Sequence, residues 1–331
     1  MQTIRAGVWG VGAWGEKHAR VYHALPEAEL VGVYDHHPGR AEEVAARYAC
    51  RAFESPAALL EACEAVSIAV PTVAHREACE RAAAARRPML VEKPMAPTVA
   101  DADAMIDAAR AAGVRLQVGQ VERFNPALLA ARPHIQSPKF IESHRLAKFQ
   151  PRSLDIDVVF DLMIHDIDAV LDVVGSAPSS ISAVGVAVLS ENEDIANARL
   201  EFPDGCVANL TASRVSTERL RRIRFFTADR YVSVDLFEKN GEMIRADVAL
   251  LKAARVNPLA ALGAIARGPL AVEEGEPLTL ELRAFLRSLR GDGAGAASGE
   301  AGRAALAVAE EVRSAMKRRA RQWASLSSAG S

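Results

Sequence analysis

The chain has 331 residues, half of them hydrophobic and a quarter charged, and its formal net charge is −2 at pH 7. This length exceeds one ordinary core and predicts two domains. The balanced charge gives no reason to expect a nucleic-acid partner. We see no signal-peptide pattern, no apolar run of the ~18 residues that a membrane span needs, and only four scattered cysteines. We therefore expect a cytoplasmic protein without stable membrane insertion and with reduced thiols.

Residues 1–122 alternate short apolar runs with Ala-rich helical segments. This alternation predicts parallel crossover units and a doubly wound sheet. The expected strands are residues 3–9, 29–34, 65–70, 88–91 and 115–119. The expected helices are residues 14–24, 39–48, 74–86 and 98–112. Because ligands bind at the carboxyl ends of strands in such sheets, residues that follow a strand are the first candidates for a binding site.

Residues 123–331 have a different pattern, which predicts an α/β domain for substrate binding and oligomerisation with an open, mostly antiparallel sheet. The expected strands are residues 139–147, 180–189, 195–202, 206–213, 219–226 and 231–236. Asp204-Gly205 predicts a hairpin turn between two of them. One face of such a sheet can be covered by helices while the other stays free for a partner.

Helices are expected over residues 158–174, 278–290 and 300–324 of this second domain. A loop over residues 148–156 precedes the first of these helices. The Gly/Ala/Ser-rich segment 291–299 lies between the last two, and we expect a flexible surface loop there.

A G-x-G-x-x-G motif, Gly10 to Gly15, follows the first predicted strand and opens a helix. Its glycines allow a tight turn and close approach to a pyrophosphate, and the helix N-terminus offers free N–H groups. Asp35 ends the second predicted strand, where a carboxylate accepts ribose hydroxyls and repels a 2′-phosphate. This pattern favours NAD over NADP. Arg40 is the counterargument, because it could turn toward a phosphate.

The expected cofactor residues follow successive strands. They are Gly10, Gly12, Ala13, Trp14, Gly15, Asp35, His36, Pro71, Thr72, His75, Glu92 and Lys93. Thr72 could instead cap the helix over residues 74–86, and His75 could be structural.

Lys93 follows an apolar strand and precedes Pro94, a position where packing gives no reason for a lysine. Partial desolvation there would lower its pKa and suit it to proton or charge work. The alternative is a surface lysine paired with Glu92.

Asp161 and His165 are four residues apart on a predicted helix and therefore share a face. A carboxylate beside an imidazole fixes its tautomer and supports it as a proton acceptor. The nearby Asp166 and Asp168 raise a metal-site alternative, but oxidising an alcohol with NAD needs no metal when a lysine faces the substrate. A capped helix with solvated acids is a further alternative.

The glycine motif, the Glu-Lys-Pro sequence at 92–94 and the Asp161/His165 pair together resemble the Gfo/Idh/MocA oxidoreductases over nearly the whole chain. The resemblance implies an N-terminal Rossmann domain and a C-terminal domain whose exposed sheet face forms homodimers or homotetramers. It also implies Lys93 and His165 as the catalytic pair and a cis peptide bond before Pro94. Asp161, which would orient His165, is the third expected catalytic residue. Which of Lys93 and His165 accepts the proton stays open.

Segments 119–126, 152–157 and 161–168 resemble a narrower group in this family. That group oxidises the C3 hydroxyl of UDP-N-acetylglucosamine to the 3-keto sugar used to make a 2,3-diamino sugar for lipid A. The resemblance implies a nucleotide-sugar substrate. Together with the residue patterns above, we expect NAD as the cofactor and no metal. The expected substrate residues are Arg123, Asn125, Arg152, Ser153, Asp157 and His165. The basic run 219–224 is a further candidate for holding the diphosphate, with a solvated strand face as its alternative.

Two departures from the family pattern bear on this choice. Residues 155–157 stand where many members carry glycines, which fits the narrower group, and Gln120 replaces a common histidine. Two alternatives remain: a family reaction on another sugar, cyclitol or nucleotide sugar, and a non-catalytic NAD-binding regulator. Retention of Lys93 and the Asp161/His165 pair argues against the regulator.

Overall fold

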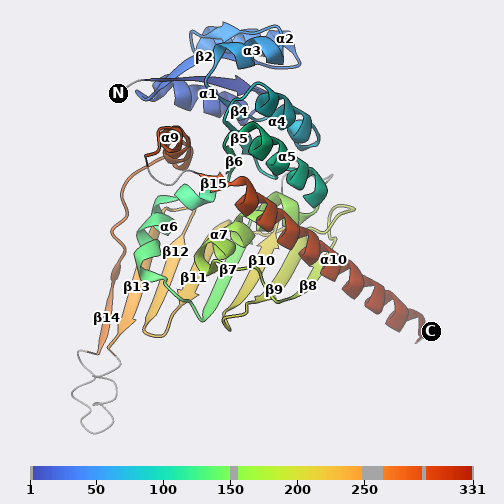
Figure 1. Ribbon diagram of the computed structural model, residues 1–331. Helices are drawn as coiled ribbons and strands as arrows, with labels where there is room; N and C mark the ends of the chain where they lie inside the picture. Colours follow the sequence, from blue (N-terminus) through green and yellow to red (C-terminus); the bar gives the residue numbers. More distant parts are fainter. Residues whose placement is uncertain (1–2, 150–155, 248–263, 293–295, 330–331) are drawn as a thin grey trace. The chain divides into compact units, whose positions relative to one another are not determined.

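The structure is a computed structural model that describes residues 3–149, 156–247, 264–292 and 296–329. The chain forms two compact units: residues 1–124 with 275–306, and residues 125–274 with 307–331. Figure 1 follows the chain from its N-terminus in blue to its C-terminus in red. The domains expected from the sequence were contiguous, 1–122 and 123–331, whereas the structure returns residues 275–306 to the first unit.

The first unit is built on a seven-stranded sheet, sheet A, in the order β15-β6-β5-β4-β1-β2-β3. Its strands are β1 (Ile4–Trp9), β2 (Ala28–Tyr34), β3 (Arg51–Ala52), β4 (Ala65–Ile68), β5 (Met89–Glu92), β6 (Leu116–Gly119) and β15 (Ala297–Ser298). All the pairings are parallel except that of β15 with β6. The strand order reverses at β1, which has β2 on one side and β4 on the other. This arrangement confirms the doubly wound sheet and puts its ligand-binding edge at the carboxyl end of β1.

Helices connect the parallel strands of sheet A. They are α1 (Gly15–Ala24), α2 (Pro38–Arg47), α3 (Pro56–Ala62), α4 (His75–Ala84) and α5 (Val99–Ala112). Local signals set their ends: at α5, the Thr98 hydroxyl accepts the Asp101 N–H at 3.1 Å, and Gly113 ends the helix with a φ of +67°. The sequence predictions missed β3 and α3 because both are too short to show a clear apolar period.

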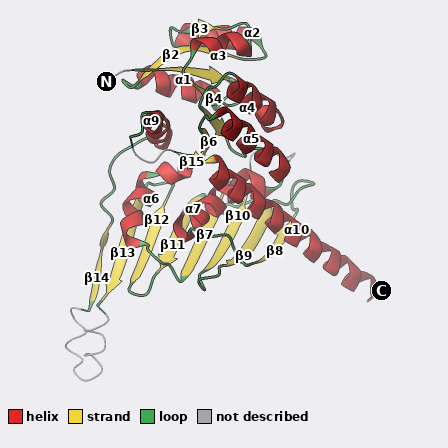
Figure 2. Ribbon diagram, viewed as in Figure 1, coloured by secondary structure: helices red, strands yellow, loops and turns green. Residues whose placement is uncertain are grey.

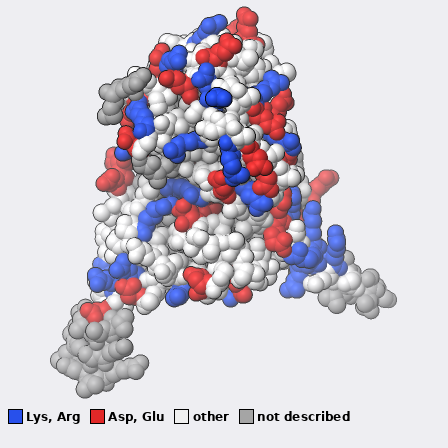
Figure 3. All heavy atoms as spheres, viewed as in Figure 1, with Lys and Arg blue, Asp and Glu red and all other residues white. Residues whose placement is uncertain are grey.

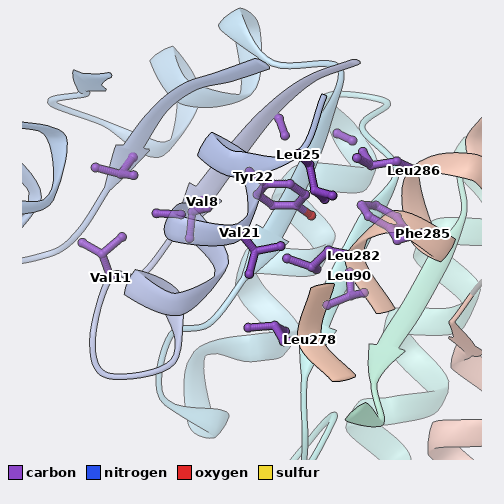
Figure 4. Packing of buried hydrophobic residues seen from close by; sticks show 14 of the residues in the cluster. Val8, Val11, Val21, Tyr22, Leu25, Leu90, Leu278, Leu282, Phe285 and Leu286 are labelled. Carbon is purple, nitrogen blue, oxygen red and sulfur yellow. The ribbon is translucent and has the colours of Figure 1, made fainter. Parts of the chain in front are cut away.

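Helix α9 (Pro277–Leu289) comes from the far end of the chain and completes the core of the first unit. Its Leu282 and Phe285 belong to the same buried cluster as Tyr22 of α1 and Leu90 of β5. Figure 4 shows these side chains gathered between the two helices and the sheet. The apolar face of α9 explains why residues 275–306 belong to this unit, since that face is buried by the N-terminal core.

Strand β15 is the next element after α9 along the chain, and it adds an edge strand to sheet A beside β6. The Gln117 side-chain oxygen accepts the Ala296 N–H at 3.1 Å, and Ala297 pairs with Val118 of β6. The expectation of a flexible loop over 291–299 is therefore wrong for residues 296–299. Helix α10 (Gly299–Ala329) follows, and its first turns belong to the first unit while the rest belongs to the second.

The second unit holds an eight-stranded sheet, sheet B, in the order β14-β13-β12-β11-β7-β10-β9-β8. Its strands are β7 (Phe140–Leu146), β8 (Ser180–Val186), β9 (Ile195–Glu201), β10 (Val207–Ser213), β11 (Leu220–Phe226), β12 (Arg230–Asp235), β13 (Asn240–Ala246) and β14 (Ile265–Pro269). Every neighbouring pair is antiparallel except β7 with β10, so the expected open, mostly antiparallel sheet is confirmed. Strands β13 and β14 were not among the predicted strands.

Helices α6 (Pro126–Ala131) and α7 (Ile164–Val174) cover one face of sheet B, as Figure 2 shows. A π-helical turn, η4 (Val159–Met163), leads into α7, and short 3-10 turns lie at η1 (Thr72–Ala74), η2 (Val121–Phe124) and η3 (Arg132–His134). On β7, Ile141, Ser143 and Arg145 are buried while the alternate residues are less covered. This period of two distinguishes a helix-covered face from an open face of the sheet.

Among the described residues, no helix combines the length and apolar character needed to cross a membrane. Figure 3 shows positive and negative side chains interspersed over the visible face, with a denser positive group near the end of α10, where residues 317–319 and 321 are Lys or Arg. Basic residues suit the C-terminal end of a helix because they complement its dipole.

Candidate functional site

The glycine motif connects β1 to α1 through a tight turn. Gly10 has a φ of +86°, and its N–H donates to the Tyr34 carbonyl oxygen at 2.7 Å. A Cβ on Gly10 would lie 2.7 Å from the Val70 nitrogen, and a Cβ on Gly15 would lie 1.8 Å from the Gly10 oxygen. A Cβ on Gly12 would meet nothing within 4 Å. Gly10 and Gly15 are thus required by the turn, whereas Gly12 leaves open space beside the backbone where a pyrophosphate can approach.

Asp35, at the end of β2, holds the glycine loop by a hydrogen bond to its backbone. Its Oδ2 accepts the Val11 N–H at 2.8 Å, and its Oδ1 accepts the His37 N–H at 2.9 Å. Arg40 donates from Nε to the Val11 carbonyl at 2.8 Å and also pairs with Glu16. The hydrogen bond from Arg40 holds the pKa of Glu16 below its ordinary value. The guanidinium of Arg40 is therefore engaged by the loop and its neighbour.

A cavity of about 710 Å³ lies at the carboxyl edge of sheet A, beside this loop. Its volume is within the ~300–1,000 Å³ typical of small-molecule and cofactor sites. It is lined by seven of the expected cofactor residues: Gly10, Gly12, Ala13, Trp14, Asp35, His36 and Pro71. Sequence reasoning missed other lining residues, among them Trp9, Tyr34, His37, Pro56, Glu77 and Arg81. Their types and spacing form no motif, and only the packing of α3 and α4 beside the loop brings some of them here.

Thr72 and His75 lie close to this cavity along the chain but do not line it. Helix α4 begins after Ala74 without a side-chain cap, so Thr72 is not its cap. The His75 ring is buried, with Nε2 2.9 Å from the Val70 carbonyl oxygen and Nδ1 3.1 Å from the Pro94 carbonyl oxygen. Burial lowers the pKa of His75 and favours the neutral ring. His75 thus joins the segments that follow β4 and β5, as the structural alternative expected.

Lys93 directly follows β5 and precedes a cis peptide bond to Pro94, as the family resemblance implied. The Lys93 N–H donates to Glu92 Oε2 at 3.2 Å, and Glu92 Oε1 lies 2.8 Å from Nε2 of His18 on α1. Both His18 and Glu92 are buried, and the other ring nitrogen of His18 has no hydrogen-bond partner among the described residues. This arrangement favours the tautomer in which His18 Nε2–H donates to Glu92 Oε1. Glu92 therefore anchors the backbone of the Lys93 segment.

Sequence reasoning missed His18 because no local signal relates position 18 to position 92. The two residues meet only because α1 packs on sheet A. A histidine in a helix that directly follows a glycine motif was the single available hint.

Asp161 and His165 lie on one continuous helical segment of the second unit, and Asp157 directly precedes that segment. Asp157 Oδ1 accepts the N–H groups of Val159 at 3.0 Å and Phe160 at 3.2 Å, and burial raises the pKa of its carboxyl. Asp161 lies in the π turn η4, and His165 lies in the first turn of α7, within about one turn of Asp161. Such π turns occur frequently at functional sites. The expected helix over 158–174 is thus present, with an unpredicted π turn at its start.

Two buried ion pairs stabilise the surroundings of this segment. Arg145 of β7 donates to Asp166 from Nε at 2.8 Å and from Nη2 at 3.0 Å. Arg214 donates to Asp194 at 2.8 Å and to the Ile156 carbonyl oxygen at 2.8 Å. Burial alone would raise the pKa of Asp194, but hydrogen bonds from backbone N–H groups and from Arg214 hold it well below its ordinary value. Both Asp166 oxygens are taken by Arg145, which weakens the metal-site alternative.

Within the part of the chain that the structure describes, no group of three or more His, Cys, Asp or Glu side chains is placed to hold a metal ion. The four cysteines are free thiols.

The expected substrate residues divide into three sets. Asn125 caps α6 and donates from Nδ2 to the Leu236 carbonyl at 2.8 Å, so, like Asp157, it is used by the fold itself. Arg123 lies half-buried in η2, and His165 lies half-buried in α7. Arg152 and Ser153 lie outside the described residues.

Comparisons with known proteins agree with these motifs. Residues 4–120 match the model of an oxidoreductase family with an NAD-binding Rossmann fold, and residues 118–231 match the Gfo/Idh/MocA C-terminal domain. The chain is 38% identical over 318 residues to UDP-N-acetylglucosamine 3-dehydrogenase of Acidithiobacillus ferrooxidans, covering 96% of this chain and 98% of that protein. It is 29% identical over 232 residues to the NAD⁺-dependent scyllo-inositol 2-dehydrogenase of Bacillus subtilis, covering 64% of this chain and 68% of that protein.

The fold comparison extends over the same length. A solved structure of UDP-N-acetylglucosamine 3-dehydrogenase GnnA from Acidithiobacillus ferrooxidans matches with a TM-score of 0.87 and 38% identity, covering 96% of this chain and 99% of that one. Full-length similarity, two family domains in the right order and the motifs described above lead to one conclusion: the chain belongs to the Gfo/Idh/MocA family of oxidoreductases.

Proposed function

We propose that this protein oxidises the C3 hydroxyl of UDP-N-acetylglucosamine to the 3-keto sugar, with NAD⁺ as the hydride acceptor. The observation that carries this proposal is the 38% identity, over 96% of the chain, to a protein of that activity. The residue pattern supports it, because Lys93 follows β5 at the ligand-binding edge of sheet A and His165 lies just after the π turn of the second unit.

The residues of the glycine loop fit the cofactor. The pyrophosphate would lie beside Gly12, where the space next to the backbone is open, and Asp35 would accept the ribose hydroxyls. When bound, NAD⁺ supplies an acceptor for the hydride of C3. Asp35 repels a 2′-phosphate, and Arg40 is engaged by Val11 and Glu16, so we propose NAD rather than NADP. We expect kcat/KM for NAD⁺ to exceed that for NADP⁺ by about tenfold or more; a preference for NADP⁺ would contradict this assignment.

The proposed roles follow from side-chain chemistry. His165, oriented by Asp161, takes the proton of the C3 hydroxyl as the hydride leaves that carbon. The Lys93 ammonium stabilises the developing alkoxide, an electrostatic effect worth about 3 kcal/mol. The exchange of roles, with Lys93 as the proton acceptor, gives the same products.

The direct test is incubation with UDP-N-acetylglucosamine and NAD⁺, followed by NADH absorbance and the mass of the product. We expect NADH to form and the sugar nucleotide to lose two hydrogens. A panel of inositols, sugars and other UDP-sugars distinguishes the alternatives. Turnover of another compound but not of UDP-N-acetylglucosamine would favour a different family reaction, and NADH binding without any turnover would favour a regulator.

Replacement of the lysine tests its role. We expect Lys93→Met to lower kcat by about 10²–10⁴-fold and to leave the Kd for NADH within about threefold of the wild type. Lys139→Met, at an exposed lysine just before β7, is the matched control. Equal loss of turnover and NADH binding in Lys93→Met would contradict the proposed role.

We further propose that the protein is a homodimer or homotetramer through the open face of sheet B. Phe140, Phe226 and Tyr231 form an aromatic row on that face, with ring centroids 5.5 Å and 5.1 Å apart. Light scattering of the wild type and of Phe226→Glu tests this: a monomeric wild type would contradict it. The proposed reaction and the free thiols favour a cytoplasmic location, where the 3-keto product would pass to an aminotransferase on the way to lipid A.

A further inference from the structure

The second unit contains a cavity of about 460 Å³ with a basic lining. Lys148, Arg214, Arg219 and Arg221 contribute positive charges, and Asp161 contributes a negative one. Arg214 pairs with the buried Asp194, and the other charged residues of the described lining are three cations and one carboxylate. We propose that this cavity binds the diphosphate of the nucleotide-sugar substrate. The identity of the sugar rests on the proposed function, whereas the diphosphate site rests on this cavity.

Strand pairing brings the cations together. β7 and β11 are antiparallel neighbours, and Leu146 lies opposite Leu220. The C-terminal end of β7 and the N-terminal end of β11 therefore lie side by side at the same end of sheet B. Lys148 follows β7 by two residues, and Arg219 directly precedes β11. These residues, distant in the sequence, therefore lie around one opening.

The basic run 219–224 divides between the two faces of the sheet. Arg221 shares the side of the buried Ile223, which is the helix-covered face, because side chains alternate along a strand. Arg222 and Arg224 point to the open face, where Arg222 pairs with Asp235 at 3.2 Å. The solvated-face interpretation thus holds for Arg222 and Arg224, while Arg219 and Arg221 line the cavity.

The chemistry of the lining suits a diphosphate. A guanidinium offers paired N–H donors that match phosphate oxygens. Arg219 lies over the Phe237 ring, with its central carbon 4.0 Å from the ring centroid. Stacking restrains the guanidinium plane and leaves its edge available for hydrogen bonds. The volume also falls in the ~300–1,000 Å³ range of small-molecule sites.

The position of the cavity agrees with chemistry at C3. Asp161 lines the cavity, and His165 lies within about one helical turn of Asp161 on the same segment. In a nucleoside-diphosphate sugar, only the anomeric oxygen, C1 and C2 separate the nearest phosphorus from C3. A diphosphate held by Arg219 and Arg221 would therefore leave the sugar ring within reach of His165.

The test is calorimetric titration of UDP, and separately of inorganic pyrophosphate, into protein saturated with NADH, so that the glycine loop is already occupied. We expect Arg221→Ala to weaken UDP binding about 10–100-fold and Lys148→Ala, at an exposed position, to weaken it about fivefold or more. Arg221→Lys should recover part of the loss, because it restores the charge. The matched control is Arg222→Ala, the next residue on β11 but on the opposite face, which should leave UDP affinity within about twofold.

The outcomes separate this site from the proposed reaction. Absence of UDP binding in the NADH-saturated wild type, or wild-type UDP affinity in both Arg221→Ala and Lys148→Ala, would overturn the site. Loss of UDP binding in both variants, combined with no oxidation of UDP-N-acetylglucosamine, would support the site and reject the reaction. Oxidation of UDP-N-acetylglucosamine with an unchanged KM in both variants would support the reaction and reject the site.

Discussion

The glycine loop allows a paired experiment in which neighbouring glycines are expected to fail in different ways. Gly10→Ala puts a side chain at a φ of +86° and forces its Cβ to 2.7 Å from the Val70 nitrogen and 2.8 Å from the Ala69 carbonyl carbon. The left-handed conformation costs about 1–2 kcal/mol. The overpacking adds about 1–3 kcal/mol, because backbone atoms cannot rotate away as a flexible side chain can. At about 2–4 °C per kcal/mol for a domain of this size, we expect Tm to fall by about 4–20 °C.

Gly12→Ala is the opposite case. Its Cβ would meet nothing within 4 Å, so the fold should tolerate it, with a change in stability within about 0.5 kcal/mol. The added methyl group would project where the pyrophosphate needs close backbone approach. We therefore expect the Kd for NADH to rise about tenfold or more, which corresponds to about 1.4 kcal/mol.

Thermal denaturation followed by circular dichroism, and calorimetric titration with NADH, measure the two effects separately. If Gly12→Ala binds NADH as tightly as the wild type, the cavity beside Gly12 is not the pyrophosphate site. If Gly10→Ala melts at the wild-type temperature, the backbone at Ala69 and Val70 relaxes and the steric reasoning is wrong.

Three further predictions concern buried polar groups and thiols. His18→Ala should destabilise the protein by about 1–3 kcal/mol, because the buried Glu92 side chain loses its hydrogen-bond donor. The loss of stability should be smaller when Glu92→Gln is already present; an equal loss in both backgrounds would mean that the two residues are not coupled. The depressed pKa of Asp194 means that its contribution to stability is present above about pH 4 and is lost as the pH falls below the unfolded value near 3.9. The urea-midpoint gap between the wild type and Asp194→Asn should therefore narrow in acid, and a gap independent of pH would disprove this. Burial raises the pKa of Cys63 and of Cys206 to about 11, so a neutral-pH thiol reagent should label them only after unfolding, and rapid labelling of the native protein would contradict their burial.

Local pattern was sufficient where the signal itself is local. The strand-and-helix alternation of the first unit, the glycine turn and the Asp204-Gly205 hairpin were all predicted, and Gly205 has the positive φ of +83° that such a turn needs. Strand β8 shows the limit: it ends at Val186 rather than at residue 189. The buried Asp194 carboxylate accepts the N–H groups of Val188, Leu189 and Ser190 and bends the chain there.

By itself, the sequence of this protein determined most of the longer helices and strands, the position of the glycine turn and the chemical character of Lys93, Asp161 and His165. Only the tertiary structure decided which distant residues meet. It paired His18 with Glu92, returned α9 to the N-terminal core and divided the basic run 219–224 between two faces of sheet B. The physical reason is that hydrophobic periodicity specifies which face of a helix or strand must be buried. Because the hydrophobic effect is non-directional, it does not specify which other surface will bury that face. The partners of each buried group follow only from how all the faces pack at once.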